Sequence, residues 1–277
     1  MSLNIVGKDA TTGLHEIDSV MMSLDKFDTV TVTERDDDRI NIRFLNADIG
    51  EDNTALRAAL AVKENIGGVD IEIEKGIPIG AGLGGSSADG AAVLRALDVL
   101  YKLPERGVDM RKVALSVGSD VPFMLSGGLA RVRGTGDDMF FIENKLQLFI
   151  VGLMSDSVFT ARAYADFDKL YAERSYCPTD TDKLCAALLD GENSALEFFD
   201  NALYRPAVMQ SSAIERNASL LRSHGAVTCM TGSGGMVLGY FTDLEKFAAC
   251  AHALRSADGF CVFAPAKTGV LHEWLNK

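Results

Sequence analysis

The stretch that decides the fold is Pro78-Ile-Gly-Ala-Gly-Leu-Gly-Gly-Ser-Ser-Ala88. Before it, the alternating segment Val69-Asp-Ile-Glu-Ile-Glu-Lys75 predicts a strand, and after it an alanine- and leucine-rich segment predicts a buried helix. The glycines leave backbone N–H groups accessible, and the first amides of a helix carry partial positive charge. A strand, a glycine loop and a helix in this order predict a phosphate-binding loop.

Two better-known nucleotide-binding loops match this stretch less well. In the pattern G-x-x-x-x-G-K-[ST], Gly80 and Gly85 match, but Ser86 stands where the lysine belongs. In the dinucleotide pattern G-x-G-x-x-G, Gly80, Gly82 and Gly85 match, yet residues 102–107 after the helix read as a turn instead of a second parallel strand. A purely structural role, in which the glycines only permit a tight turn, accounts poorly for so long a run.

The composition is that of a folded, acidic protein. The chain has 277 residues, of which 47% are hydrophobic, which is enough for two domains. A net charge of -12 disfavours nucleic acid or an anionic membrane as a partner, since both require a concentrated positive surface. With no run of 18 apolar residues and no signal-peptide pattern, we expect a cytoplasmic protein. The five cysteines are scattered without a C-x-x-C pair, so we expect free thiols.

The hydrophobic pattern changes near residue 152. The first half contains alternating strand segments, a helical segment at 53–65, and an apolar run at 146–153 that predicts a buried strand. The second half contains helical segments at 160–174, 181–189, 211–224 and 243–256, and strand segments at 227–230, 236–241 and 259–263. We therefore predict two domains, 1–152 and 153–277, the second an α+β domain with an antiparallel sheet.

Two glycine motifs carry a family resemblance. Pro78 and the run Gly82-Leu-Gly-Gly-Ser-Ser-Ala88 resemble the second motif of the GHMP kinases, with one extra glycine, and Thr231-Gly-Ser-Gly-Gly235 resembles the third motif, a turn between strands. The resemblance implies a two-domain α+β GHMP kinase fold. Its N-terminal ribosomal S5-like α/β domain binds ATP, its C-terminal domain is a ferredoxin-like α+β domain, and the active site lies in the cleft between them.

Within that family, the segments 52–59, 118–123 and 134–137 resemble the members of the non-mevalonate isoprenoid pathway. The implied activity is ATP-dependent phosphorylation of a hydroxyl of 4-diphosphocytidyl-2-C-methyl-D-erythritol, with ATP and Mg²⁺ as cofactors. The implied partner is a small molecule, and the implied assembly a monomer or homodimer. No acidic residue stands out as a Mg²⁺ ligand.

The resemblance also assigns site residues. Asp120 matches the catalytic aspartate that helps to remove the proton of the attacking hydroxyl; from the residues alone, an aspartate before Val-Pro can equally be a cap. The positions that match nucleotide contacts are Asn53, Lys75, Pro78, Gly80, Ala81, Gly82, Leu83, Gly84, Gly85, Ser86 and Ser87. A lysine that ends a strand is usually only solvated.

A second set matches the cytidine side of the substrate. His15, in Gly13-Leu-His-Glu-Ile17, corresponds to a histidine at the cytosine edge, and an imidazole can donate or accept there. Tyr164 offers a ring on which a pyrimidine can stack, although an ordinary half-buried helix aromatic explains it too. The other positions assigned to substrate are Thr160, Gly232, Ser233 and Gly234.

Two departures from the family keep alternatives open. Leu14 stands where the family has a tyrosine, which favours a GHMP kinase for another small alcohol. The family's first strand carries Lys-x-Asn, whose lysine lies beside the catalytic aspartate, and we expect the N-terminus here to be truncated or replaced at that point. Loss of that lysine favours a catalytically impaired GHMP-fold binding protein.

Overall fold

The computed structural model describes residues 1–172 and 175–271, in two compact units. Unit 1 is made of Met1–Asp25, Gly80–Leu83 and Leu129–Ala266, and unit 2 of Lys26–Ile79, Gly84–Gly128 and the C-terminal segment from Lys267. Each unit is assembled from separate stretches of chain. The boundary at residue 152, which we drew from the sequence between two domains, stays a prediction.

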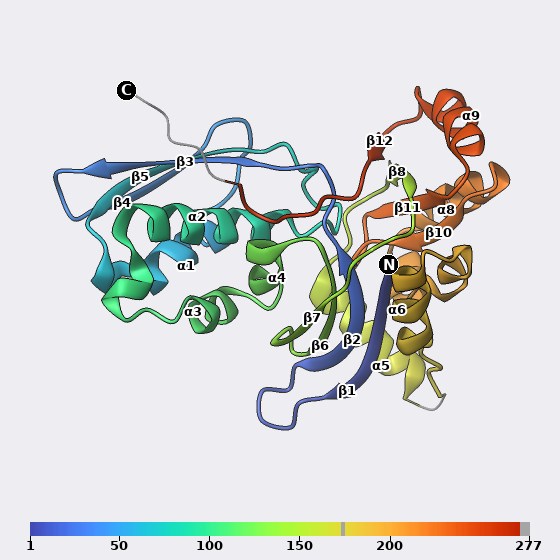
Figure 1. Cartoon of the computed structure of the whole chain (residues 1–277), viewed down its shortest axis with the longest axis horizontal. Helices are drawn as coiled ribbons and strands as arrows, with labels where there is room; N and C mark the ends of the chain where they lie inside the picture. Colours follow the sequence, from blue (N-terminus) through green and yellow to red (C-terminus); the bar gives the residue numbers. More distant parts are fainter. Residues whose placement is uncertain (173–174, 272–277) are drawn as a thin grey trace. The chain divides into compact units, whose positions relative to one another are not determined.

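Unit 2 is built on a sheet of three strands in the order β3 (Thr29–Arg35), β5 (Gly68–Glu74), β4 (Ile40–Phe44). The central strand runs antiparallel to β3 and parallel to β4. It alternates buried Val69, Ile71 and Ile73 with acidic residues, so the sheet has one apolar face. Helices α1 (Thr54–Ala61) and α2 (Gly85–Tyr101) cover that face (Figure 1).

The remaining elements of unit 2 are short. They are the 3-10 turns η1 (Lys63–Asn65) and η2 (Leu103–Arg106) and the helices α3 (Met110–Val117) and α4 (Val121–Ser126). The helix predicted over 53–65 is therefore α1 followed by a 3-10 turn. The element after α2 is η2, which confirms that no second Rossmann strand follows the helix.

Helix α2 is buried on one face. Val93, Leu94 and Leu97 are fully buried against the sheet and against α1. The alanines at 88, 92 and 96 are only half-buried, so the helix predicted to be buried is covered fully on one face alone. The helix begins directly after the glycine loop, so its packing fixes the place where the loop ends.

Unit 1 contains two sheets. The five-stranded sheet has the order β7 (Asp138–Phe141), β6 (Leu129–Gly134), β2 (His15–Met22), β1 (Ser2–Lys8), β9 (Asp200–Asn201). The four-stranded sheet is antiparallel throughout and has the order β10 (Val227–Met230), β11 (Met236–Phe241), β8 (Phe149–Met154), β12 (Phe260–Phe263). The second sheet confirms the predicted antiparallel arrangement.

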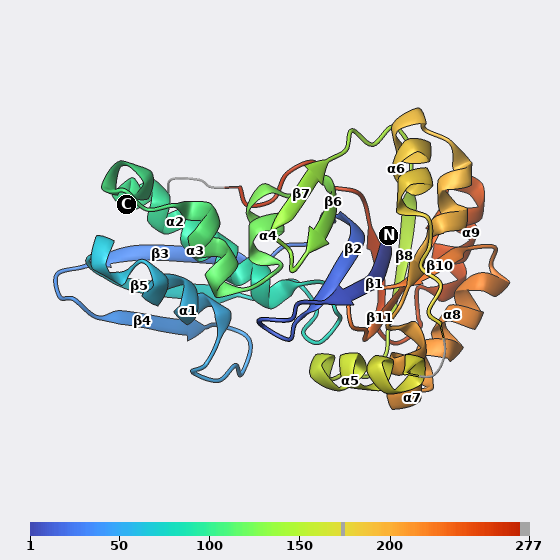
Figure 2. The same ribbon diagram turned by 90° about the horizontal axis from the view of Figure 1, so that it is seen from below.

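Helices cover the four-stranded sheet on both faces. Ile150 of β8 packs in a cluster with Leu184 of α6 (Thr181–Asp190), whereas its neighbours Val151 and Leu153 pack in a cluster with residues of the opposite face. On that face α8 (Ala213–Ser223) and α9 (Leu244–Leu254) lie against the sheet (Figure 2). A strand buried on both sides reads as the continuous apolar run seen in the sequence.

Several elements of unit 1 were not predicted from the sequence. They are the strands β2, β6, β7 and β9, the 3-10 turn η3 (Asn193–Phe198) and the helix α7 (Tyr204–Gln210). Helix α5 (Thr160–Tyr171) packs on α7 (Figure 2). The predicted segment 160–174 extends into residues 173–174, which lie outside the described residues. The five cysteines are free thiols, as predicted, with Cys177 exposed. Among the described residues no helix is both long and apolar enough to span a bilayer.

Candidate active site

The glycine loop has a backbone that only glycine adopts easily. Gly82 has φ +70° and Gly84 has φ +71°, in the left-handed region. A Cβ atom on Gly82 would lie 2.6 Å from the carbonyl oxygen of Thr231 and 2.8 Å from that of Gly234. The loop segment 80–83 therefore lies directly against the 231–235 turn, backbone to backbone, within unit 1.

This contact joins the two motifs that were singled out from the sequence. The hydroxyl of Thr231 donates a hydrogen bond of 2.6 Å to the carbonyl oxygen of Ala81. Asn201 holds the other side of the turn, since its side-chain amide donates to the carbonyl oxygens of Met230 and Gly232, both at 2.8 Å. The two motifs stabilise each other, because their glycines let the two backbones approach closely and the hydroxyl of Thr231 forms a hydrogen bond between them.

The start of α2 supplies donors for an anion. Its N-cap Gly84 has no side chain to cap the helix, and the first turn contains no acidic residue. The first amides of a helix have no carbonyl partner within it, and they carry the positive end of the helix dipole. Ser86 is exposed, and its hydroxyl lies 2.5 Å from that of Thr54. The loop thus offers amides and hydroxyls of the kind that bind phosphate.

Lys75 lies in a buried ionic cluster. Its Nζ is 2.5 Å from Oδ2 of Asp28 and 2.6 Å from Oδ2 of Asp89, and its side chain is only 6% exposed. Asp28 also accepts hydrogen bonds from the amides of Gly76 and Ile77 at the start of the loop. The ammonium is thus already paired with two carboxylates. Its assignment as a nucleotide contact stays a prediction.

The second carboxylate of this cluster has an unusual environment. Burial raises the pKa of Asp89 to about 7, although the ammonium of Lys75 works in the opposite direction. Its Oδ1 atom is buried and has no hydrogen-bond partner in the described part of the chain. Two carboxylates sharing one ammonium favour a proton on one of them, and Asp89 is the one whose pKa is raised.

Asn53 caps helix α1. Its Oδ1 accepts from the amide of Leu56 at 2.9 Å, and its Nδ2 donates to the carbonyl oxygens of Gly50 and Glu51. These contacts use its donors and its acceptor locally, as expected of an N-cap asparagine. Its predicted contact with the nucleotide is not tested by these bonds.

Asp120 lies at the start of α4 and does not cap the helix with its side chain. Burial raises the pKa of its carboxyl, and a hydrogen bond from Ser119 offsets part of that shift. Among the residues that the structure describes, no ion pair reaches Asp120. A half-buried carboxyl without a cation and with a raised pKa is suited to taking up a proton.

The residues predicted for the cytidine side come together in unit 1. The rings of His15 and Tyr164 stack with their centroids 4.8 Å apart and an interplanar angle of 29°. One helical turn before Tyr164, the hydroxyl of Thr160 lies 2.7 Å from that of Ser233. Residues from β2, from α5 and from the 231–235 turn thus form one cluster of two rings and two hydroxyls.

Sequence reasoning missed the acidic partners of this cluster and of the lysine. Asp168 lies one turn after Tyr164 on α5 and accepts a hydrogen bond from His15. Asp168 is four residues after Tyr164, and this spacing in a predicted helix indicates that the two side chains lie on the same face. Asp89 lies two residues after Ser87, but its contact with Lys75 depends on tertiary structure.

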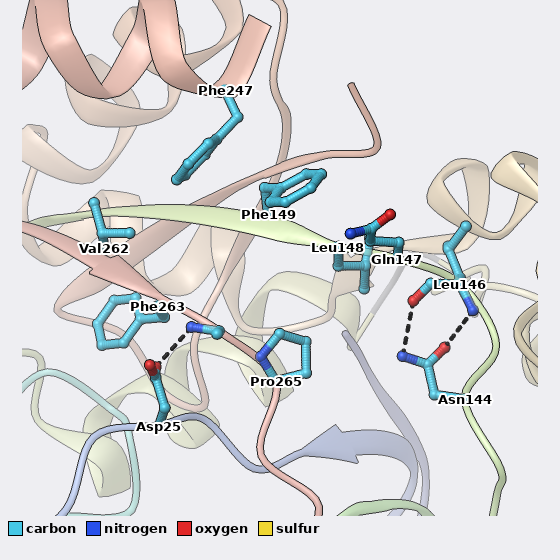
Figure 3. Close-up of a pocket in the computed structure, with 11 residues that line it drawn as sticks. Asp25, Asn144, Leu146, Gln147, Leu148, Phe149, Phe247, Val262, Phe263 and Pro265 are labelled. Atoms are coloured by element: carbon cyan, nitrogen blue, oxygen red, sulfur yellow. Dashed lines mark hydrogen bonds between the residues drawn. The ribbon is translucent and has the colours of Figure 1, made fainter. Parts of the chain in front are cut away.

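A separate cavity of about 450 Å³ lies in unit 1 (Figure 3). Its walls include the rings of Phe149, Phe247 and Phe263, with Asp25 accepting from the amide of Ala264 at its edge. None of the residues assigned to the site from the sequence line it. Within the described residues no three histidine, cysteine or acidic side chains are grouped so as to hold a metal ion.

Comparison with known proteins places this chain among kinases. Residues 53–128 match the GHMP kinases N terminal domain. The 4-diphosphocytidyl-2-C-methyl-D-erythritol kinase of Caldicellulosiruptor saccharolyticus is 32% identical, over 95% of this chain and 90% of that protein. The enzyme of the same name from Acaryochloris marina is 34% identical, over 92% of this chain and 88% of that protein.

Solved structures agree with the sequence comparison. A crystal structure of 4-(cytidine 5'-diphospho)-2C-methyl-D-erythritol kinase matches with a TM-score of 0.75 at 28% identity, covering 94% of both chains. Methanococcus jannaschii mevalonate kinase matches with a TM-score of 0.65 at 16% identity, covering 91% of this chain and 92% of that chain, and shows the shared fold alone.

Proposed function

The chain belongs to the GHMP kinase family, and from that membership we propose that it transfers the γ-phosphate of ATP to a hydroxyl group of 4-diphosphocytidyl-2-C-methyl-D-erythritol. The observation that carries the proposal is the cluster of His15, Tyr164, Thr160 and Ser233, which offers two rings and two hydroxyls to a nucleotide base. The relatives, which are named for this substrate, give no support to another small alcohol.

In this proposal the glycine loop binds ATP. The amides at the start of α2 and the hydroxyls of Ser86 and Ser87 hold phosphate oxygens, and the helix dipole offsets their charge. Glycine at positions 82 and 84 keeps side chains out of the path of the phosphates. The loop attracts an anion locally although the protein carries a net charge of -12.

Asp120 acts as the general base. Its carboxylate accepts the proton of the substrate hydroxyl as the hydroxyl oxygen attacks the γ-phosphorus in line with the departing ADP. Only the ionised carboxylate can do this, and burial raises its pKa. The rate should therefore fall as the pH drops through that raised pKa.

Mg²⁺ is part of the proposal as the companion of ATP. It would be held mainly by phosphate oxygens and would neutralise charge that develops on them during transfer. We further place the enzyme in the cytoplasm, as a monomer or homodimer acting on small molecules. The net charge of -12 supports the exclusion of nucleic acid as a partner.

A coupled ADP-release assay with the cytidine-linked substrate tests the function. Wild-type protein should release ADP only when substrate and Mg-ATP are both present, with one phosphomonoester formed for each ADP. Asp120→Asn should lower kcat by about 10²- to 10⁴-fold. Asp109→Asn is the matched control, because Asp109 caps α3 and asparagine caps a helix equally well.

The outcomes separate two claims. Wild-type protein without turnover of the cytidine-linked substrate would refute the function itself. Turnover at the wild-type rate in Asp120→Asn would refute only the assignment of the base.

A further inference from the structure

A chain of three side chains runs through the proposed base pocket. Nε2 of His15 lies 2.7 Å from Oδ1 of Asp168, and Oδ2 of Asp168 lies 3.0 Å from Nζ of Lys8. Lys8 and His15 are direct cross-strand partners in the β1–β2 pair, and Asp168 reaches both from α5. The same carboxylate is thus shared between a lysine and the imidazole.

The orientation of the imidazole is fixed by its neighbours. The ring of Tyr164 stacks on it, and the edge of Phe167 lies against it at a centroid distance of 6.4 Å. The side chain of His15 is 13% exposed. Because the ring is held in place, its hydrogen bonding then depends on which ring nitrogen, Nδ1 or Nε2, carries the proton.

Asp168 sets that position. An ionised carboxylate only accepts hydrogen bonds, so a neutral imidazole facing it must carry its proton on Nε2. The pKa of Asp168 is lowered, because the hydrogen bonds from His15 and Lys8 outweigh the effect of burial. Nδ1 makes no hydrogen bond to any of the described residues, and in this tautomer it has a free lone pair.

We propose that Asp168, oriented by Lys8, is a positioning residue that holds His15 as the Nε2–H tautomer and so makes the pocket select cytosine over uracil. The inference rests on the proposed function and names the basis of its base specificity. An accepting Nδ1 pairs with the exocyclic amino group of cytosine, whereas uracil presents a carbonyl oxygen at that position. Two acceptors facing each other in a partly buried pocket are strongly disfavoured.

Stability alone does not explain the arrangement. The side chain of Lys8 is 52% exposed and that of Asp168 is 43% exposed, and ion pairs this exposed contribute little to folding. What the pair does provide is a defined orientation of the carboxylate toward the imidazole. A role in orienting His15 accounts for both of its contacts.

The decisive variant is Asp168→Asn. Lys8 can only donate, so it takes the amide oxygen and turns the amide NH₂ toward His15. Nε2 must then accept, the proton moves to Nδ1, and the pocket presents a donor that suits a carbonyl. The preference for CDP over UDP, measured by calorimetry at pH 8, should fall by about tenfold or more. The ¹⁵N signals of His15 should change from the Nε2–H to the Nδ1–H pattern.

Two further variants separate orientation from charge. Asp166→Asn is the matched control, because Asp166 lies on the same helix and pairs with Arg162 and Lys169; it should keep the CDP preference within about twofold. In Lys8→Met with Asp168→Asn, the amide is free to turn its oxygen to His15, so the preference for CDP should partly return. A merely structural role for Asp168 would not produce that rescue.

Each outcome decides something. A CDP preference that Asp168→Asn retains, or an Nδ1–H pattern for His15 in the wild-type protein, would overturn this inference and leave the proposed function intact. The wild-type spectrum decides the matter even if the variant does not fold. Wild-type protein that binds neither CDP nor UDP would overturn the proposed function together with the inference.

Discussion

The glycine loop and the His15 cluster differ in the groups that they present to a ligand. In the loop the exposed groups belong mainly to the backbone, and Gly82 packs so closely on Thr231 and Gly234 that no side chain fits at position 82. In the cluster, rings and hydroxyls from β2, α5 and a turn lie together, and their chemistry depends on partners such as Asp168. A backbone site tolerates few residue types, whereas a side-chain site can be retuned by one substitution.

The difference explains which region can be recognised from a sequence. A loop that needs glycine at fixed positions leaves a continuous signature. A cluster of side chains from separate elements leaves isolated residues whose partners are set by packing. Substitutions in each region should therefore have effects of different size.

The largest effect is expected from Gly82→Ala. The new methyl would lie 2.6 Å from a carbonyl oxygen, in a conformation with φ +70° that L-residues rarely adopt. We expect kcat/KM for ATP to fall by about 10- to 100-fold, because strain of about 1–3 kcal/mol displaces the loop. Gly107→Ala is the control: it has φ +81° but open space around it. Equal kinetics in both variants would show that the close packing at Gly82 is not needed.

A smaller effect is expected from the charges beside the loop. With the pKa of Asp89 at about 7, the native state keeps a proton that the unfolded chain releases near pH 4, so stability falls as the pH rises between these values. We expect the free energy of unfolding in urea to drop by about 2–3 kcal/mol from pH 5 to pH 8.

Asp89→Asn should remove most of that drop, because an amide can bond to Lys75 without titrating. Asp98→Asn, on the same helix and paired with Arg95, should keep the wild-type pH dependence. An unchanged slope in Asp89→Asn would assign the proton to another group.

The smallest effect is expected at Leu14. Its side chain is 56% exposed next to His15 in the chain, at the position where the family resemblance implied a tyrosine. Leu14→Tyr should lower KM for the cytidine-linked substrate by about threefold to tenfold, through about 1 kcal/mol of stacking. KM for ATP should not change. If KM for the cytidine-linked substrate and KM for ATP both stayed unchanged, the side chain at position 14 would not contact the base.

The sequence by itself determined the elements whose signals are local. Alternation in residues 69–75, the glycine run and the apolar helix after it were enough to identify β5, the loop and α2. Thr160 and Tyr164 are four residues apart on α5, a spacing that puts them on the same face of the helix. These features depend on residues that are close together in the chain, where backbone geometry relates sequence to structure directly.

Tertiary structure decided how the remaining charged groups are paired. Lys75 lies between Asp28 and Asp89. His15 contacts Asp168, from which it is separated by 153 positions in the chain. Such pairings form because a buried or half-buried charge must find a partner once the strands and helices have packed. A lysine, an aspartate or a histidine in the sequence indicates that a charged or hydrogen-bonding partner is needed. Only the packed fold determines which residues lie close enough to be that partner.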